Sequence, residues 1–148
     1  ANQQLIIKKY VHIGIAADTP RGLLVPVVRN ADQKSISQLA AEISDLADRA
    51  RNKKLKPDEM EGGTFTLSNQ GGIGGVCFTP IVFWPQAAIL GVSRASIMPR
   101  YIDGEFKPRS LLPLSLSFDH RIIDGADAAR FLRWVCESIE QPFTMVLE

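Results

Sequence analysis

The stretch Ser115-Leu116-Ser117-Phe118-Asp119-His120-Arg121-Ile122-Ile123-Asp124-Gly125 combines the end of a strand, a turn and the start of a helix. Apolar and polar residues alternate up to Phe118, which predicts a half-buried β-strand. A helical pattern follows from Ala126 to Ile139. His120 therefore lies where a strand gives way to a helix, a position that can hold a side chain and still let it reach a ligand. Because histidine exchanges a proton near neutral pH, His120 is the first candidate catalytic residue.

Outside this stretch, the sequence predicts one more long helix and several short strands. Apolar residues recur at helical spacing from Ile36 to Ala50, after a Ser35–Gln38 capping-box pattern and before Pro57. The expected strands cover residues 5–17, 23–28, 64–68, 87–94 and 110–118. Pro26 cannot donate a ladder hydrogen bond, so its strand belongs at a sheet edge or a bulge. Two amphipathic helices among mostly hairpin-connected strands predict an α+β sandwich, a mixed β-sheet with helices on one face.

The bulk composition describes one ordinary globular domain. A chain of 148 residues with 45% hydrophobic content is long enough to bury a core. A net charge of +1 gives no reason to expect nucleic acid or an anionic membrane as a partner. The sequence shows no membrane span and no signal peptide. Cys77 and Cys136 form no disulfide or metal pattern, which favours a reducing compartment.

Five basic residues lie at the end of the first predicted helix: Arg49, Arg51, Lys53, Lys54 and Lys56. Cations at a helix C-terminus complement the helix dipole, and this solvated role is the favoured interpretation. Binding of an acidic ligand is the alternative. The glycine-rich run 71–75 predicts a flexible turn that lets chain segments approach closely, because it fits neither a P-loop nor a dinucleotide-binding pattern. His12 lies within an apolar segment and is expected to be structural.

The segment Asp119–Gly125 resembles the DHRxxDG signature of the dihydrolipoamide acyltransferases, the core subunits of 2-oxo acid dehydrogenase complexes. Four more blocks resemble that family and follow its order: Val11–Ala16, Gly22–Val28, Thr64–Asn69 and Gln86–Val92. The resemblance implies a chloramphenicol acetyltransferase-like fold. It also implies that residues 1–148 form the C-terminal part of one acyltransferase catalytic domain, truncated at its N-terminus, because the strand expected at residues 5–17 corresponds to one well inside that domain.

The resemblance assigns roles to three residues. His120 would be the general base that removes the proton from the thiol of coenzyme A or dihydrolipoamide. Ser68 would donate a hydrogen bond to the oxyanion of the tetrahedral intermediate. Asp124 would hold the site in shape, partly by pairing with an arginine from the N-terminal part of the domain. In that family the site lies between neighbouring subunits of a trimer, so His120 of one chain is predicted to work with Ser68 of another.

The residues alone leave plainer roles open. Ser68 could be a turn residue, and Asp124 could be the N-cap of the following helix. A Ser/His/Asp hydrolase is disfavoured because the sequence lacks a nucleophile elbow. A metal site at His120 and Asp124 is disfavoured because no further histidine or cysteine cluster supports it. Phe83 and Trp84 depart from the family pattern, and core packing, channel shape and a subunit contact all stay open for them.

The resemblance is closest to the pyruvate branch, which implies transfer of an acetyl group. Branched-chain acyl specificity is the alternative, and a non-catalytic assembly fragment is the rival class. Coenzyme A is implied as a substrate, with the lipoyl group carried on a separate domain. The implied partners are further copies of this chain in a homotrimer within a cubic or icosahedral core, lipoyl domains, and the decarboxylase and dihydrolipoamide dehydrogenase subunits. A bacterial cytoplasm is expected, with the mitochondrial matrix as the alternative.

Overall fold

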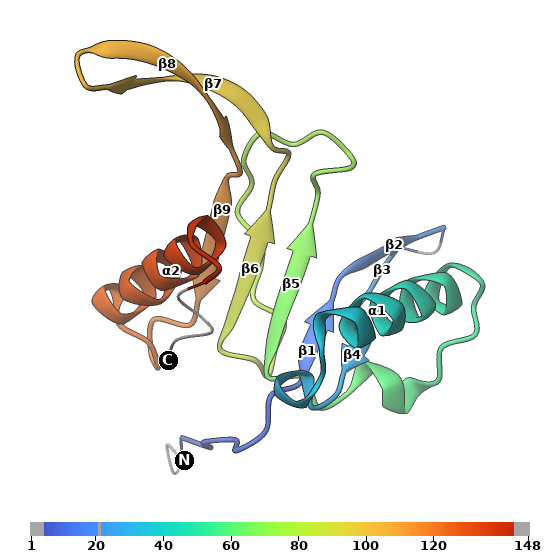
Figure 1. Ribbon diagram of the computed structural model, residues 1–148. Coiled ribbons are helices and arrows are strands. Elements are labelled where there is room, and N and C mark those ends of the chain that lie inside the picture. Colours follow the sequence, from blue (N-terminus) through green and yellow to red (C-terminus); the bar gives the residue numbers. More distant parts are fainter. Residues whose placement is uncertain (1–4, 21, 144–148) are drawn as a thin grey trace.

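The computed structural model describes residues 5–20 and 22–143 (Figure 1). Its centre is a five-stranded sheet in the order β4-β1-β5-β6-β9. The strands are β1 (Ile13–Ile15), β4 (Val27–Val28), β5 (Phe65–Asn69), β6 (Ala88–Val92) and β9 (Leu114–Phe118). The three central strands run parallel, whereas β4 and β9 pair antiparallel at the two edges. The sheet is therefore mixed, and the predicted α+β class is confirmed.

Two long helices, α1 (Ile36–Arg51) and α2 (Gly125–Glu140), lie in front of the sheet in the view of Figure 1. The predicted capping box starts α1: Ser35 Oγ accepts from Gln38 N, and Gln38 Oε1 accepts from Ser35 N. The two 3₁₀ turns η1 (Ala31–Gln33) and η2 (Pro57–Met60) flank α1 in the chain. Both amphipathic patterns therefore form the helices that the sequence predicts.

The last helix buries less of its apolar face than its pattern predicts. Ala128 is buried, and Phe131 makes an edge contact with Phe65 of β5 at 5.8 Å between ring centroids. However, Phe131 stays 41% exposed and Ile139 stays 57% exposed. The reason is visible in Figure 1, where α2 extends past β9, the edge of the sheet.

Three of the expected strands are divided or much shorter than predicted, and the strand expected at 87–94 is trimmed to β6. Residues 5–12 form no strand, and the segment expected at 5–17 contributes only β1 and β2 (Ala17–Thr19). The segment 23–28 divides into β3 (Gly22–Leu24) and β4 around Pro26, and 110–118 divides around Pro113. Proline lacks the N–H that a ladder needs, which explains both interruptions. The placement of Pro26 next to an edge strand is confirmed, because β4 ends the sheet.

A long hairpin, β7 (Ser96–Ile102) and β8 (Glu105–Leu111), projects away from the sheet in Figure 1 and was not predicted. Asp103 and Gly104 form its turn with φ angles of 53° and 85°. Positive φ at both central residues is typical of the type I′ turn that joins two-residue hairpins. Nearly all of its side chains are exposed in this chain.

The buried core lies around β1, β4, β5 and β6. His12 is only 9% exposed, its Nδ1 accepts from Asn30 N at 3.0 Å, and its own N–H donates to Thr64 Oγ1 at 3.1 Å. The structural role expected for His12 is therefore confirmed. Cys77 and Cys136 are free thiols. Within residues 5–20 and 22–143, neither helix has the length and apolarity that crossing a bilayer requires.

Candidate active site

Asp119 fixes the turn that carries His120. Its N–H donates to the carbonyl of Ala87, the residue just before β6, at 2.8 Å. Its own carbonyl accepts from the N–H groups of Ile122 and Ile123, both at 3.0 Å. Its carboxylate accepts from the backbone N–H of Arg121, also at 3.0 Å. Asp119, the residue before His120, therefore makes four hydrogen bonds that tie the turn to itself and to the sheet.

The Arg121 guanidinium completes this arrangement with a bidentate pair. Its Nε donates to Asp119 Oδ1 at 2.9 Å and its Nη2 donates to Asp119 Oδ2 at 2.6 Å. This side-chain hydrogen bond, followed by the backbone N–H of Arg121, lowers the pKa of the Asp119 carboxyl to about 2. The same pair raises the pKa of Arg121. In the sequence, Asp119 and Arg121 stand out only through the motif, although their spacing of two residues suits an Asx-type turn.

His120 itself is exposed at the end of β9. Its ring lies over Phe118 at 5.5 Å between centroids. A Cβ atom placed on Gly125, the first residue of α2, would stand 3.9 Å from His120 Nε2. A larger side chain at that position would therefore extend against the imidazole. Glycine at the start of α2 leaves this side of the ring without a side chain from that position.

Asp124 is the N-cap of α2, and its Oδ1 accepts from Asp127 N at 2.8 Å. The plainer role left open by the sequence is therefore present in the structure. Among the described residues, Asp124 has no ion pair. An arginine partner for it, as the resemblance implies, stays a prediction. No group of three or more potential metal ligands occurs in the described part of the chain.

Ser68 lies half-buried near the end of β5. It shares a face of the strand with Thr66, opposite to the face where Phe65 meets α2. Its register partner is Gly91 on β6, where a Cβ would come within 2.8 Å of the Phe78 ring. The segment that follows β5 therefore folds back over the Ser68 face of the sheet, and Gly91 makes room for it.

The glycine-rich run after β5 forms a turn held by Arg94. Arg94 Nε donates to the Gly71 carbonyl at 2.9 Å and Nη2 donates to the Gly72 carbonyl at 3.3 Å. Gly74 has a φ of 117°, a conformation that glycine adopts without strain. The predicted turn is present. The two hydrogen bonds from Arg94 hold this loop against the residues that follow β6.

Ser68 and His120 of one chain do not meet. Ser68 pairs with Gly91, and Gly91 pairs with Ser115 on β9. His120 follows Ser115 by five residues and lies beyond the end of β9. At ~3.3 Å per residue, the strand alone carries the chain about 10 Å from Ser115 to Phe118 before His120 is reached, and β6 separates β9 from β5 by a further strand. The two side chains are too far apart for a hydrogen bond within one chain.

The sequence model of the 2-oxoacid dehydrogenases acyltransferase (catalytic domain) family matches residues 1–147. A dihydrolipoyllysine-residue acetyltransferase component of the pyruvate dehydrogenase complex from Pseudomonas aeruginosa is 57% identical over 147 residues, 99% of this chain and 27% of that protein. The corresponding component from Azotobacter vinelandii is 62% identical over 133 residues, 90% of this chain and 21% of that protein. The chain thus spans about a quarter of the length of these curated relatives.

Solved structures of related proteins have the same fold. The cubic core of a pyruvate dehydrogenase multienzyme complex superposes with a TM-score of 0.93 at 58% identity, covering 97% of this chain and 59% of that one. The dihydrolipoamide acetyltransferase of Azotobacter vinelandii gives 0.92 at 59% identity, with the same coverage. That enzyme was studied for the catalytic roles of a serine, a histidine 52 residues later and an asparagine four residues beyond. On these matches, this chain belongs to the 2-oxoacid dehydrogenase acyltransferase family, as part of its catalytic domain.

Proposed function

We propose that the chain contributes to acetyl transfer between dihydrolipoamide and coenzyme A, with His120 as general base. The observation that carries the proposal is a match in residue type and spacing. Ser68 precedes His120 by 52 residues and Asp124 follows it by four, as do the serine, histidine and asparagine studied in the Azotobacter enzyme. The exposed ring on a turn fixed by four hydrogen bonds suits a residue that meets a mobile substrate.

The proposed proton transfer needs only modest assistance from the site. A thiol of ordinary pKa ~8.5 passes its proton to an imidazole of ordinary pKa ~6.5 with modest assistance. The thiolate attacks the carbonyl of the partner thioester, and a new C–S bond forms. The tetrahedral intermediate then collapses, its other C–S bond breaks, and the imidazolium returns the proton to the departing thiolate. His120 is thus unchanged after each transfer in either direction.

Ser68 supplies the hydrogen bond that this intermediate needs. Its hydroxyl, held on a paired strand, would donate to the oxygen that becomes negative in the transition state. A donor positioned in advance contributes ~10²–10³ in rate. Because Ser68 and His120 of one chain lie far apart, the proposal requires that Ser68 of one subunit and His120 of another form each site. In a closed threefold ring, three equal interfaces provide three such sites.

Asp124 supports α2 rather than the reacting atoms. The Azotobacter enzyme has an asparagine at the corresponding spacing, and an amide oxygen caps a helix about as well as a carboxylate. We therefore assign Asp124 a positioning role: it starts α2 directly after the turn that holds His120.

A mixing experiment tests the shared site. His120→Ala and Ser68→Ala subunits of the full-length protein, each inactive alone, are dissociated, mixed in equal amounts and reassembled. Independent pairing across each interface should restore about one quarter of the wild-type activity per site, measured as formation of acetyl-dihydrolipoamide from acetyl-CoA. Each variant reassembled alone is the control.

Two outcomes would contradict this proposal. If the mixture stays inactive although native electrophoresis shows mixed oligomers, the site is not shared. If His120→Ala alone stays within about tenfold of the wild-type rate, His120 is not the general base, since that role is worth ~10²–10⁴. If the wild-type protein itself shows no acetyl transfer, the alternative of a non-catalytic assembly fragment is favoured.

The same comparisons support the proposed partners. The relatives are components of pyruvate dehydrogenase complexes, and one solved relative is a cubic core. We propose a homotrimer within such a core, served by lipoyl domains and accompanied by decarboxylase and dihydrolipoamide dehydrogenase subunits. Coenzyme A is the proposed acyl acceptor, and acetyl is favoured over branched-chain groups because of these relatives. Their bacterial sources favour a bacterial cytoplasm as the compartment.

A further inference from the structure

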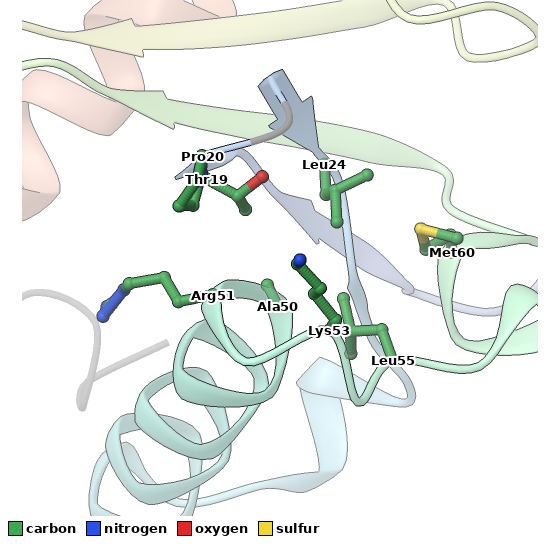
Figure 2. Close-up of a pocket in the computed structure, with 8 residues that line it drawn as sticks. All are labelled: Thr19, Pro20, Leu24, Ala50, Arg51, Lys53, Leu55 and Met60. Carbon is green, nitrogen blue, oxygen red and sulfur yellow. The ribbon is translucent and has the colours of Figure 1, made fainter.

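A cavity of about 220 Å³ lies between the β2–β3 hairpin and the C-terminal end of α1 (Figure 2). Three parts of the chain line it: the hairpin with Thr19 and Leu24, the helix end with Ala50 and Lys53, and the following segment with Leu55 and Met60. None of the proposed catalytic residues lines this cavity. Its walls are mainly aliphatic, and no carboxylate is among the lining residues.

Lys53 has an unusual backbone conformation at this place. Its φ is 60°, in the left-handed region, directly after the end of α1. Its N–H donates to the Ala50 carbonyl at 3.2 Å, and the next N–H, of Lys54, donates to the Arg49 carbonyl at 2.8 Å. Glycine is the residue that normally ends helices in this way, because a Cβ is strained there. A strained backbone at a lysine is a reason to examine what its side chain contacts.

The Lys53 ammonium group lies beside the cavity (Figure 2). Figure 2 shows its ammonium group directed into the space between the helix end and the hairpin, whereas Arg51 extends away from the other side chains. Arg51 pairs with Asp48 at 3.2 Å, and Arg49 pairs with Asp45 at 2.7 Å. No ion pair or hydrogen bond involves the Lys53 ammonium within the described residues. It is thus a cation without a counter-charge beside an apolar hollow.

The size of the cavity restricts its ligand. Pockets for cofactors and drug-sized molecules measure ~300–1,000 Å³, more than this cavity offers. By comparison, an apolar cavity of ~150 Å³ holds benzene. The cavity therefore has room for one apolar side chain, with a negative group next to it on Lys53. A peptide segment fits these limits, because it presents both groups on neighbouring residues.

We propose that this cavity is a docking site for an acidic segment of another protein. One apolar side chain of the segment enters between Leu24, Leu55 and Met60, and an adjacent carboxylate pairs with Lys53. The site is separate from the proposed acyl transfer, so its binding is measured without reference to activity.

The test uses the full-length protein and a fluorescein-labelled peptide, acetyl-Asp-Glu-Leu-Asp-Glu-amide, at 0.15 M salt. Fluorescence anisotropy should show saturable binding that weakens about tenfold or more in Lys53→Glu, as expected for loss of a charged hydrogen bond. Lys54→Glu is the matched control, since it makes the same charge change one residue away and outside the cavity. Screening over ~8 Å at this salt should leave its affinity nearly unchanged.

A second variant separates binding from folding. Lys53→Gly removes the ammonium and also relieves the left-handed strain, so it should raise the Tm by about 2–4 °C while binding is lost. Three results would overturn the proposal: equal weakening by Lys54→Glu, unchanged binding to Lys53→Gly, or equally tight binding of a peptide whose leucine is replaced by alanine.

Discussion

At the scale of single residues, the turn that carries His120, the proposed base, is held by the charged residues on either side of it. Asp119 binds the turn through its backbone and its carboxylate, and Arg121 grips both carboxylate oxygens. A proton acceptor that is displaced by about 1 Å can cost ~10²-fold in rate. The proton transfer proposed for His120 is therefore expected to depend on this pair.

Asp119→Asn tests this dependence. The amide oxygen can still accept from Arg121 N, but the bidentate charge pair is lost, so kcat should fall ~10-fold or more with a smaller change in KM. Because the pair places the pKa of Asp119 at about 2, below its ordinary value, the stability it provides is present above pH ~4 and is lost as the pH falls towards 2. The variant should therefore show a shallower fall of Tm between pH 4 and 2.

Arg121→Lys is the companion variant, because it keeps the charge and removes the fork that binds both oxygens. It should resemble Asp119→Asn in kcat and retain more of the pH dependence. If both variants keep wild-type kcat, the pair has no influence on His120.

Asp124 gives a second prediction at this scale. Asp124→Asn should keep the helix cap and leave both Tm and activity nearly unchanged, since asparagine and aspartate are equivalent N-caps. Asp124→Ala should lower the free energy of unfolding by about 1 kcal/mol. Thermal denaturation of the two variants, with acetyl transfer measured alongside, decides the matter. A large loss of activity in Asp124→Asn with unchanged Tm would show that the negative charge itself is needed.

The sequence predicted the residues whose structural role depends only on neighbours close by in the chain. The capping residues Ser35 and Asp124 were visible because caps depend on neighbours a few positions away. The distance between Ser68 and His120 was not visible, because it follows from strand order and register. Nothing in a single sequence states that β9 runs antiparallel to β6 and carries His120 away from Ser68.

At the scale of elements, the hairpin β7–β8 shows why some strands escape prediction. It has the Asp103-Gly104 signal of a type I′ turn. However, its strands bury no face in this chain and contain Pro99 opposite Pro108, so neither alternation nor propensity marks them as strands. The helices were predicted within one or two residues, because their apolar residues recur at helical spacing and their N-termini are capped by Ser35 and Asp124.

The hairpin turn gives a prediction of its own. Gly104 has a φ of 85°, and a Cβ there would meet no other atom within 4 Å. Gly104→Ala should therefore cost only backbone strain, about 1–2 kcal/mol. Because the hairpin projects from the sheet, the loss should appear as faster amide hydrogen exchange in β7 and β8, with exchange in β5 and β6 unchanged. Equal acceleration in all four strands would mean that the hairpin and the sheet unfold as one unit.

At the scale of the whole molecule, several large apolar side chains are exposed to solvent in a single chain. Ile97 and Phe106 on the hairpin are 78% and 74% exposed, and Trp134 on α2 is 54% exposed. Scattered apolar residues are normal on a surface, but contiguous ones mark interaction sites. The hairpin stands away from its own sheet, so its apolar residues gain little from their own chain. They are suited to contacts between chains.

Self-association through the hairpin is the last prediction. Ile97→Lys places a charge on the exposed hairpin without disturbing the core, so the fold should persist, as judged by circular dichroism. Sedimentation velocity of the full-length protein should show a shift from the assembled state towards smaller species, because a buried unpaired charge is costly at an interface. Ser37→Lys on the exposed side of α1 is the control with the same added charge. If both variants sediment like the wild type, the hairpin lies outside the subunit contacts, and the proposed shared site of Ser68 and His120 requires another surface.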